Sequence, residues 1–237
     1  MSEISGSAPR LDVGVLIAAA GRGERAGAGE PKQFRLIRGA PMLLRSIRPF
    51  ARHPRVRGIV IALPPDSVSN PPEWLASLVS DRLHFVAGGG TRAESVKAAL
   101  DAIAPECTTV LVHDAARPFV APEIVDAVIA CADAGNGALP AIPVSDTLKR
   151  TQPGSPRVTE TVSRAGLWRA QTPQGFPRSM IETAYAQAAS GEIPAFTDEA
   201  SLVEAAGFQV EIVPGGDRNI KVTTEDDFAL AELLADR

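Results

Sequence analysis

Cysteine and histidine are scarce in this sequence, and their scarcity limits the kinds of site that the chain can form. Of 237 residues only Cys107 and Cys131 are cysteines, and each lies in an apolar stretch. Two cysteines cannot build a disulfide framework or a cysteine-rich zinc cluster, so we expect a reducing compartment and two buried thiols that act as small apolar side chains. The three histidines are scattered and show no metal-ligand spacing. A zinc centre is therefore not expected.

Long apolar runs and an excess of positive charge are also missing. The first ten residues are polar, and no window approaches the roughly 18 consecutive apolar residues of a membrane span. The chain has 24 basic and 28 acidic residues and a net charge of −4. Affinity for a phosphate backbone comes mainly from a positive surface, so this balance argues against binding of nucleic acid. We predict a cytoplasmic protein that binds neither a membrane nor nucleic acid.

The rest of the composition, 45% hydrophobic and 22% charged, is typical of a globular domain. Short apolar runs predict strands at residues 13–19, 58–63, 83–87, 109–113, 138–142 and 208–213. Helical spacing and capping residues predict helices at residues 41–50, 91–103, 122–135, 177–189 and 198–206, and from Thr224 onward. This alternation predicts one α/β domain over residues 1–237, with a Rossmann-like, mostly parallel twisted sheet and helices on both faces. Ligands of such sheets bind at the carboxyl ends of the strands.

The alternation fails between residues 145 and 171. Residues 146–150 and 157–162 have the pattern of a β-hairpin with polar faces, joined by a Pro/Gly/Ser turn. A lone hairpin buries too little surface to be stable by itself. We therefore predict a projecting β-hairpin arm at residues 145–171 that packs on a second subunit and makes a homodimer. The alternative is a hairpin that folds onto its own sheet.

A glycine-rich loop follows the first predicted strand. Small residues let backbone N–H groups approach a phosphate chain, because no side chain blocks them. The candidates are Ala18, Ala19, Ala20, Gly21 and Gly23. Arg25 and Lys32 flank the loop, and Lys32 is one of only four lysines in the chain. The spacing continues neither as GxGxxG nor as GxxxxGK[ST], so we favour a triphosphate site over a dinucleotide site.

Two further loops follow predicted strands. The segment GGGTRAES supplies Gly89, Gly90, Arg92 and Ser95 at the start of a helix whose Thr91 and Glu94 form a capping box. In the segment HDAARP, Asp114 is placed to hold a ribose hydroxyl or Mg²⁺, and Arg117 to hold an anion. We expect His113 to be packed or hydrogen-bonded rather than catalytic. Late in the chain, Arg164, Thr197 and Lys221 are each as compatible with a salt bridge or a helix cap as with a site.

Taken together, eight segments resemble the 2-C-methyl-D-erythritol 4-phosphate cytidylyltransferase family, in that family's order, from about Val13 to Leu234. The segments are AAAGRGERAGAGEPKQF, GGGTRAESV, VHDAARPFV, SDTLKR, TVSRAGLW, QTPQGF, FTDEASLVEAAGF and NIKVTTEDD. The resemblance implies an enzyme that transfers CMP from CTP to 2-C-methyl-D-erythritol 4-phosphate, with release of pyrophosphate, in the non-mevalonate isoprenoid pathway. It implies CTP on the first two loops, Mg²⁺ bridging the phosphates, the polyol phosphate on the late residues, and a homodimer.

The resemblance also implies roles for single residues. Arg25 and Lys32 would stabilise the transition state at the α-phosphorus, and Lys221 and Arg164 would position the incoming phosphate. Substrate-contacting positions are matched by Asp114, Arg117, Thr147 and Thr197. Thr147 or Arg164 would come from the arm of the second subunit. Asp114 is the candidate metal ligand.

Three alternatives stay open from the sequence. A cytidylyltransferase acting on ribitol 5-phosphate would use the same chemistry. An NAD(P)-linked oxidoreductase built on the first loop would use Asp66 as its acidic residue, but it would leave Lys32 and the second loop without a role. A nucleotide-binding module without catalysis is the third.

Overall fold

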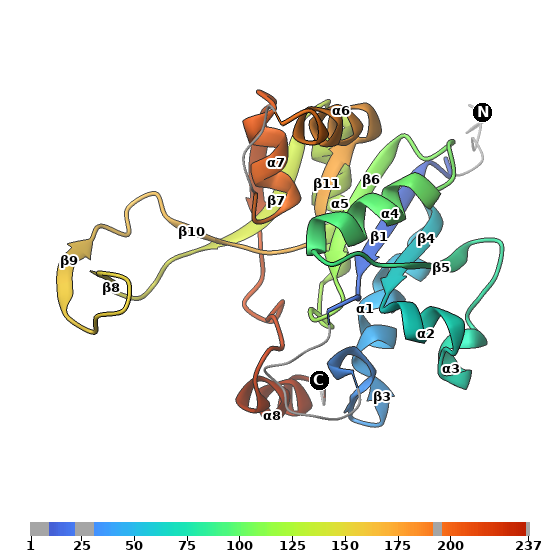
Figure 1. The fold of residues 1–237 in the computed structure, drawn as a ribbon, viewed down its shortest axis with the longest axis horizontal. Coiled ribbons are helices and arrows are strands. Elements are labelled where there is room, and N and C mark those ends of the chain that lie inside the picture. The colour runs from blue at the N-terminus through green and yellow to red at the C-terminus, as the bar shows by residue number, and fades with distance from the viewer. Residues whose placement is uncertain (1–9, 22–30, 192–195, 236–237) are drawn as a thin grey trace, which may run out of the picture.

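The computed structural model describes residues 10–21, 31–191 and 196–235. Its centre is an eight-stranded sheet in which β10, β7, β11, β6, β1, β4 and β5 follow one another, while β12 pairs with β7 (Figure 1). The sheet is mostly parallel and has helices on both faces, so the predicted fold class is confirmed.

The parallel part of the sheet is formed by the predicted apolar runs. Its strands are β1 (Val13–Ala18), β4 (Val56–Leu63), β5 (Leu83–Ala87) and β6 (Thr109–Asp114). β1 pairs in parallel with both β4 and β6, and β5 extends the sheet beyond β4. Side chains of β1 alternate between the two faces: Val15 and Ile17 enter one apolar core, whereas Leu16 enters the other. Covering both faces explains why these strands read as continuous apolar runs.

Two strands of the other half of the sheet escape prediction from the sequence. The strands here are β7 (Gly137–Pro143), β10 (Trp168–Ala170), β11 (Gln174–Pro177) and β12 (Val210–Pro214). β10 and β11, the two not predicted, are three and four residues long and too short to show an alternating pattern. β11 runs antiparallel between β6 and β7. A Cβ at Gly175 of β11 would lie 2.3 Å from Val128 Cγ1, so only glycine fits under the helix above it.

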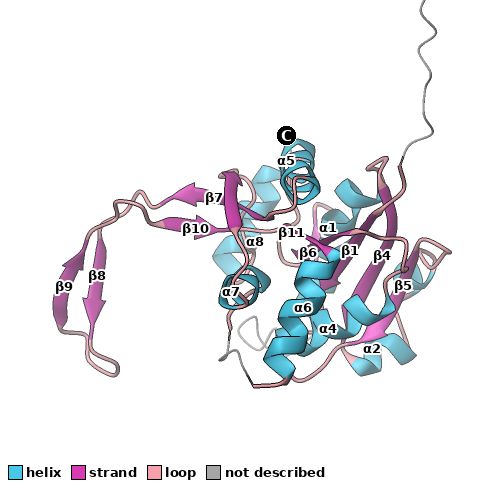
Figure 2. Ribbon diagram, turned by 90° about the horizontal axis from the view of Figure 1, so that it is seen from above, coloured by secondary structure: helices cyan, strands magenta, loops and turns pink. Residues whose placement is uncertain are grey.

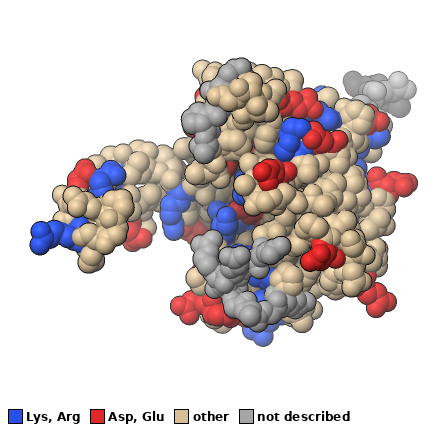
Figure 3. Space-filling model, in the orientation of Figure 1, with Lys and Arg blue, Asp and Glu red and all other residues tan. Residues whose placement is uncertain are grey.

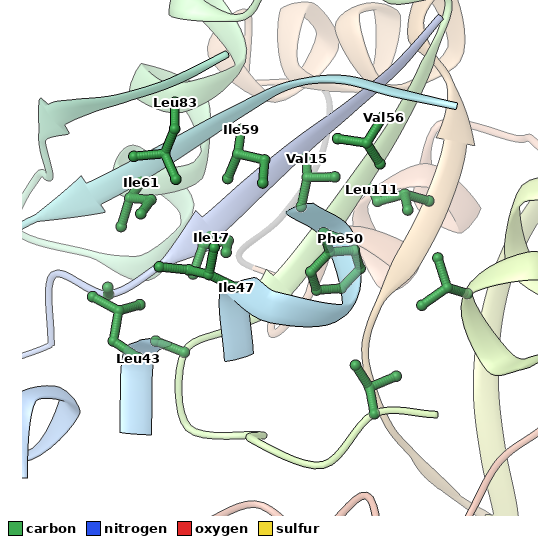
Figure 4. Packing of buried hydrophobic residues seen from close by; sticks show 14 of the residues in the cluster. Val15, Ile17, Leu43, Ile47, Phe50, Val56, Ile59, Ile61, Leu83 and Leu111 are labelled. Carbon is green, nitrogen blue, oxygen red and sulfur yellow. The ribbon is translucent and has the colours of Figure 1, made fainter. Parts of the chain in front are cut away.

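Each face of the sheet is covered by helices that bury an apolar stripe. One face carries α1 (Met42–Ala51), α2 (Pro65–Ser69), α3 (Glu73–Ala76) and α5 (Pro122–Asp133). On this face Leu43, Ile47 and Phe50 of α1 pack on Val15 and Ile17 (Figure 4). The other face carries α4 (Arg92–Ala102), α6 (Arg178–Ala189) and α7 (Glu199–Ala205). Within the described part of the chain, no helix is long and apolar enough to cross a membrane.

A third, smaller core joins the two ends of the chain. Its elements are the short helix η2 (Lys32–Phe34), the strands β2 (Leu36–Ile37) and β3 (Ala40–Pro41), and α8 (Glu225–Leu234), which Thr224 caps. Ile37 packs with Val222 and Phe228, and Arg35 forms an ion pair with Glu225 and lies 3.8 Å over the Phe228 ring. This core holds the segment that contains Lys32 beside the segment that contains Lys221.

The predicted hairpin projects from the body of the molecule. Its strands β8 (Leu148–Thr151) and β9 (Val158–Val162) form a two-stranded sheet of their own, well apart from the main sheet (Figures 1 and 2). The alternative of a hairpin folded onto its own sheet is therefore wrong. The last part of the predicted arm differs, because β10 returns to the main sheet and pairs with β7.

Candidate active site

A cavity of about 870 Å³ lies at the carboxyl ends of β1, β4, β5 and β6. This is the edge of the sheet at which open α/β folds bind ligands. Eleven of the predicted site residues line the cavity: Ala18, Ala19, Ala20, Gly21, Lys32, Gly89, Gly90, Arg92, Ser95, Asp114 and Lys221. The glycine-rich loops and two of the four lysines therefore share one space, although they are distant in the sequence.

The first loop is held in close contact with the second. Gln33, a buried residue that the sequence did not single out, donates a hydrogen bond from Nε2 to the Ala19 carbonyl at 2.9 Å. A Cβ added to Gly88 would lie 2.2 Å from the Ala20 Cβ and 2.8 Å from Ser95 Oγ. The absence of a side chain at Gly88 is thus what lets the two loops meet at the cavity wall.

The second loop is ordered by the first turn of α4. Thr91 and Glu94 form the predicted capping box, which is therefore confirmed. Ser95 is buried, and its Oγ accepts a hydrogen bond from the Gly89 N–H at 3.1 Å and donates one to the Thr91 carbonyl at 2.8 Å. The loop backbone therefore faces the cavity in a fixed shape, next to the positive end of a helix.

Asp114 is the acidic centre of the cavity, and three cations surround it. Its Oδ2 lies 2.8 Å from Lys221 Nζ and 3.8 Å from Arg117 Nε, and its Oδ1 accepts from Arg92 Nε at 3.2 Å. Burial by itself would raise the pKa of Asp114, but the positive charges of Arg92 and Lys221 outweigh it and hold the pKa well below its usual range. Asp114 is therefore an anion throughout the neutral range, and the net charge of the cluster is positive.

Arg92 bridges Asp114 to a second, fully buried carboxylate. Its Nη1 donates to Glu199 Oε2 at 2.6 Å, and the Tyr185 hydroxyl lies 3.2 Å from Glu199 Oε1. Burial raises the pKa of Glu199, and Arg92 only partly offsets this. Glu199 and Tyr185 belong to helices on the outer side of Arg92 and do not line the cavity. The sequence offered one signal for Glu199, an acidic residue on the apolar face of a predicted helix.

A buried polar network lies behind Asp114. The Asp114 N–H donates to Thr172 Oγ1 at 3.1 Å, and Thr172 Oγ1 lies 2.9 Å from His113 Nδ1. His113 Nε2 in turn lies 3.0 Å from the Arg117 carbonyl. Burial lowers the pKa of His113 to about 4, so the ring is neutral, accepts from Thr172 and donates to Arg117. The prediction that His113 is packed and hydrogen-bonded is confirmed by this placement.

The same network anchors the segment that ends in Lys221. Asn219 is fully buried, and its Nδ2 donates to the Thr172 carbonyl at 2.9 Å. The Asn219 carbonyl accepts from Arg117 Nη1 at 2.7 Å. Arg117 is itself buried and does not line the cavity. In this structure Arg117 fixes the position of the Lys221 segment, whereas the sequence suggested an anion-binding residue.

The two cavity lysines approach from opposite ends of the chain. Lys32 Nζ donates to the Val222 carbonyl at 3.1 Å, and the Val222 N–H donates to the Ala116 carbonyl at 2.8 Å. Lys221 remains about half exposed, with 47% of its side-chain surface accessible. It is therefore free to contact a ligand while Asp114 holds its ammonium group.

The remaining predicted site residues lie elsewhere. Arg164 is on the arm and donates to the Ser145 carbonyl, and Thr147 precedes β8, also on the arm. Thr197 lies just before α7, where its N–H donates to Ser201 Oγ at 3.3 Å. None of these three lines the cavity. Gly23 and Arg25 lie outside the described residues.

The mostly parallel α/β sheet, with two glycine loops and two lysines converging at its strand tips, has the features of an enzyme that binds nucleotide phosphates. More narrowly, residues 13–237 match the model of the 2-C-methyl-D-erythritol 4-phosphate cytidylyltransferase family, and the chain belongs to that family.

The relatives agree along nearly the whole chain. The 2-C-methyl-D-erythritol 4-phosphate cytidylyltransferase of Salinibacter ruber is 46% identical over 93% of this chain and 91% of its own length. That of Frankia casuarinae is 43% identical over 95% of this chain and 82% of its own. The crystal structure of the Thermus thermophilus enzyme of the same name is 34% identical, covers 95% of this chain and all of its own, and has a TM-score of 0.79.

Proposed function

We propose that this chain joins the CMP part of CTP to 2-C-methyl-D-erythritol 4-phosphate, forming 4-diphosphocytidyl-2-C-methyl-D-erythritol and pyrophosphate for isoprenoid synthesis. The observation that carries the proposal is that Lys32 and Lys221 line one cavity with two glycine-rich loops. Two phosphate substrates repel each other, and fixed positive charge in a partly closed site lowers the cost of bringing them together. The family's description names the same acceptor and the same group transfer.

The reaction needs no nucleophilic side chain. An oxygen of the polyol phosphate attacks the α-phosphorus of CTP, and the bond from that phosphorus to the bridging oxygen of the β-phosphate breaks. The electron pair of that bond leaves with pyrophosphate. Because a phosphate monoester is already ionised near neutral pH, the attack requires neither a general base nor a covalent enzyme intermediate. Catalysis then rests on positioning and on charge.

The two lysines of the cavity have different roles in the proposed reaction, because they lie at different positions. Lys32, at the exit of the first loop, neutralises charge that develops around the α-phosphorus, a role that the family resemblance also implies for Arg25. Lys221 draws in the phosphate of the acceptor, and Asp114 holds its ammonium group in place at 2.8 Å. Ala19, Ala20, Gly89 and Ser95 are small, so a pyrimidine ring fits beside them where a purine would clash.

Among its described residues, the cavity offers Mg²⁺ one suitable protein ligand, the carboxylate of Asp114. Nucleotide sites commonly bind Mg²⁺ through one or two carboxylates together with substrate phosphates. A carboxylate has about four lone-pair sites, and the close contacts of Asp114 are those with Arg92 and Lys221. A further lone pair of Asp114 could therefore bind Mg²⁺. When bound, the ion would neutralise phosphate charge and favour departure of pyrophosphate.

We also propose that the arm makes a homodimer. Thr147 and Arg164, matched to substrate-contacting and phosphate-positioning residues, lie on the arm and do not line the cavity of their own chain. In a dimer they would act in the cavity of the second subunit. The arm exposes the apolar side chains of Val158 and Leu167, which supports a partner there. A cytoplasmic location stays a prediction from the composition.

The test is a pyrophosphate-release assay with CTP, Mg²⁺ and a panel of sugar-alcohol phosphates. We expect release that depends on 2-C-methyl-D-erythritol 4-phosphate and is far slower with ribitol 5-phosphate or when ATP replaces CTP. Faster turnover of ribitol 5-phosphate would assign the chain to the other acceptor. Binding of CTP with no turnover on any acceptor would show a module without catalysis and would overturn the proposal.

A further inference from the structure

Glu199 has no role in the reaction described above, yet it occupies an unusual position. It is the first residue of α7, and its side chain is completely buried. Burying a carboxylate is costly unless a cation and further hydrogen bonds accompany it, and an apolar side chain of similar size often stabilises a fold equally well. A buried carboxylate directly behind the cavity therefore calls for an explanation beyond stability.

Its main partner is Arg92, whose guanidinium group reaches the cavity. Arg92 Nη1 donates to Glu199 at 2.6 Å, while Arg92 Nε donates to Asp114 Oδ1 at 3.2 Å. Asp114 Oδ2 is then left to Lys221, 2.8 Å away. The four groups form a chain of alternating charge that runs from the buried Glu199 at the start of α7, through the cavity wall, to the half-exposed Lys221.

Glu199 is placed where it can determine the direction in which the Arg92 side chain points. Arg92 is the first residue of α4, where the helix end and the glycine loop favour an anion. A long, flexible arginine at that place would turn toward a bound triphosphate if nothing held it. The planar guanidinium group can satisfy two carboxylates at once, so Glu199 on one edge keeps the other edge on Asp114.

We propose that Glu199 is a positioning residue: it holds Arg92 against Asp114 and thereby sets the orientation of Lys221. This inference rests on the proposed function for its kinetic consequence, but its structural consequence, the state of Lys221, does not depend on any substrate.

The first test is kinetic and uses Glu199→Gln, which keeps the shape and removes the charge. We expect kcat/KM for the polyol phosphate to fall about tenfold, the scale of one charge-assisted hydrogen bond, while KM for CTP does not rise. Tyr185→Phe is the matched control, because it removes the contact between the Tyr185 hydroxyl and Glu199 and leaves the pair with Arg92 intact. Its kcat/KM should stay within about threefold of the unchanged enzyme.

A double-mutant cycle with Arg92→Met separates positioning from a general structural role. If Glu199 acts through Arg92, adding Glu199→Gln to Arg92→Met should change kcat/KM by less than about twofold. Additive losses would overturn the inference. Should Glu199→Gln not fold, Glu199→Asp takes its place in the cycle, since it keeps the charge but shortens the side chain.

The second test needs no turnover. Acylation of lysines by an amine-reactive ester, followed by mass spectrometry, compares Lys221 with Lys97, which is paired with Asp101 on the exposed side of α4. Without the charge of Glu199, the Arg92 guanidinium group can pair with both oxygens of Asp114 and displace Lys221. In Glu199→Gln we therefore expect Lys221 to react several-fold faster while Lys97 is unchanged. An unaltered ratio of the two rates contradicts the inference even if the proposed reaction is correct. A chain inactive on every acceptor would contradict the proposed function without affecting this measurement.

Discussion

Lys32 and Lys221 illustrate how little a single residue type indicates before folding. Four lysines stand out in the sequence, and only two of them line the cavity. Lys97 is paired with Asp101 on one helix at 2.6 Å, and Lys149 lies on the arm beside Thr161. Composition therefore indicated four candidate lysines for the site. Packing in the third, smaller core brings two of them, Lys32 and Lys221, to the same cavity.

The first prediction concerns these lysines. Lys32→Ala and Lys221→Ala should each lower kcat/KM by about a hundredfold or more, which is typical of losing one charge partner of a transition state. Lys97→Ala is the matched control and should stay within about twofold. Steady-state assays on folded, purified variants check this. Near-normal turnover in either cavity variant would remove that lysine from the mechanism.

The second prediction concerns the pH dependence of stability at His113. Burial holds the pKa of His113 at about 4, below its ordinary value of roughly 6.5. Between these values the unfolded chain binds a proton that the folded chain does not, so stability falls as the pH drops through this window. The loss between pH 7 and pH 5 should be about 2 kcal/mol of unfolding free energy.

The measurement compares urea unfolding at pH 7 and pH 5 with that of His113→Gln. Glutamine keeps one donor and one acceptor for Arg117 and Thr172 but does not titrate. All other titratable groups are present in both proteins, so the comparison isolates the contribution of His113. In His113→Gln the unfolding free energy should differ much less between pH 7 and pH 5, because most of the about 2 kcal/mol change comes from His113. Equal pH dependence in the two proteins would mean that the buried ring is not the titrating group.

Among the elements, strands and helices with a strong local signal were predictable and short ones were not. The apolar run of β5 and the caps of α4 and α8 appear where the sequence placed them, because strand burial and capping depend on neighbouring residues. β11 carries Gln174 and Gly175 in a four-residue segment. It lies between β6 and β7 and pairs with both, and no local pattern along the chain indicates that pairing.

The third prediction concerns the contact between the two glycine loops. Gly88→Ala would force a Cβ to within 2.2 Å of Ala20, and overpacking of this kind costs about 2 kcal/mol. For a chain of this length the Tm should fall by roughly 4–8 °C. Gly90→Ala is the control for stability, since its Cβ would meet Glu94 at an ordinary 3.4 Å. A Tm for Gly88→Ala equal to that of Gly90→Ala would mean that the loops are not in contact.

At the scale of the whole molecule, the arm is notable because contacts within a single chain do not account for its stability. β8 and β9 share no strand pairing with the main sheet, and the arm surface carries both basic and acidic side chains, such as the paired Arg150 and Glu160 (Figure 3). A two-stranded hairpin in water is marginally stable by itself. Packing against a second copy would supply the burial that the arm lacks.

The fourth prediction follows from the arm. The Val144 N–H donates to the Leu167 carbonyl at 3.1 Å, so the ends of the arm are close enough for a short Gly-Ser turn to replace residues 146–165. We expect sedimentation to show a dimer for the full chain and a folded monomer for the shortened one. Val158→Asp should weaken the dimer without removing the arm. A full chain that sediments as a monomer would contradict the proposed assembly.

Local sequence was enough to indicate the individual strands, the two glycine loops and the capped helices, because short apolar runs, glycines and capping residues mark them within a few neighbouring positions. The parallel sheet was then inferred from the alternation of strands and helices. The positions of Asp114 between three cations, of Arg117 behind the cavity and of Glu199 behind Arg92 arose only on folding. Burial and Coulomb interactions depend on distances in space, and the partners of Asp114 come from α4, from the loop after β6 and from the segment before α8. No pattern along the chain measures those distances.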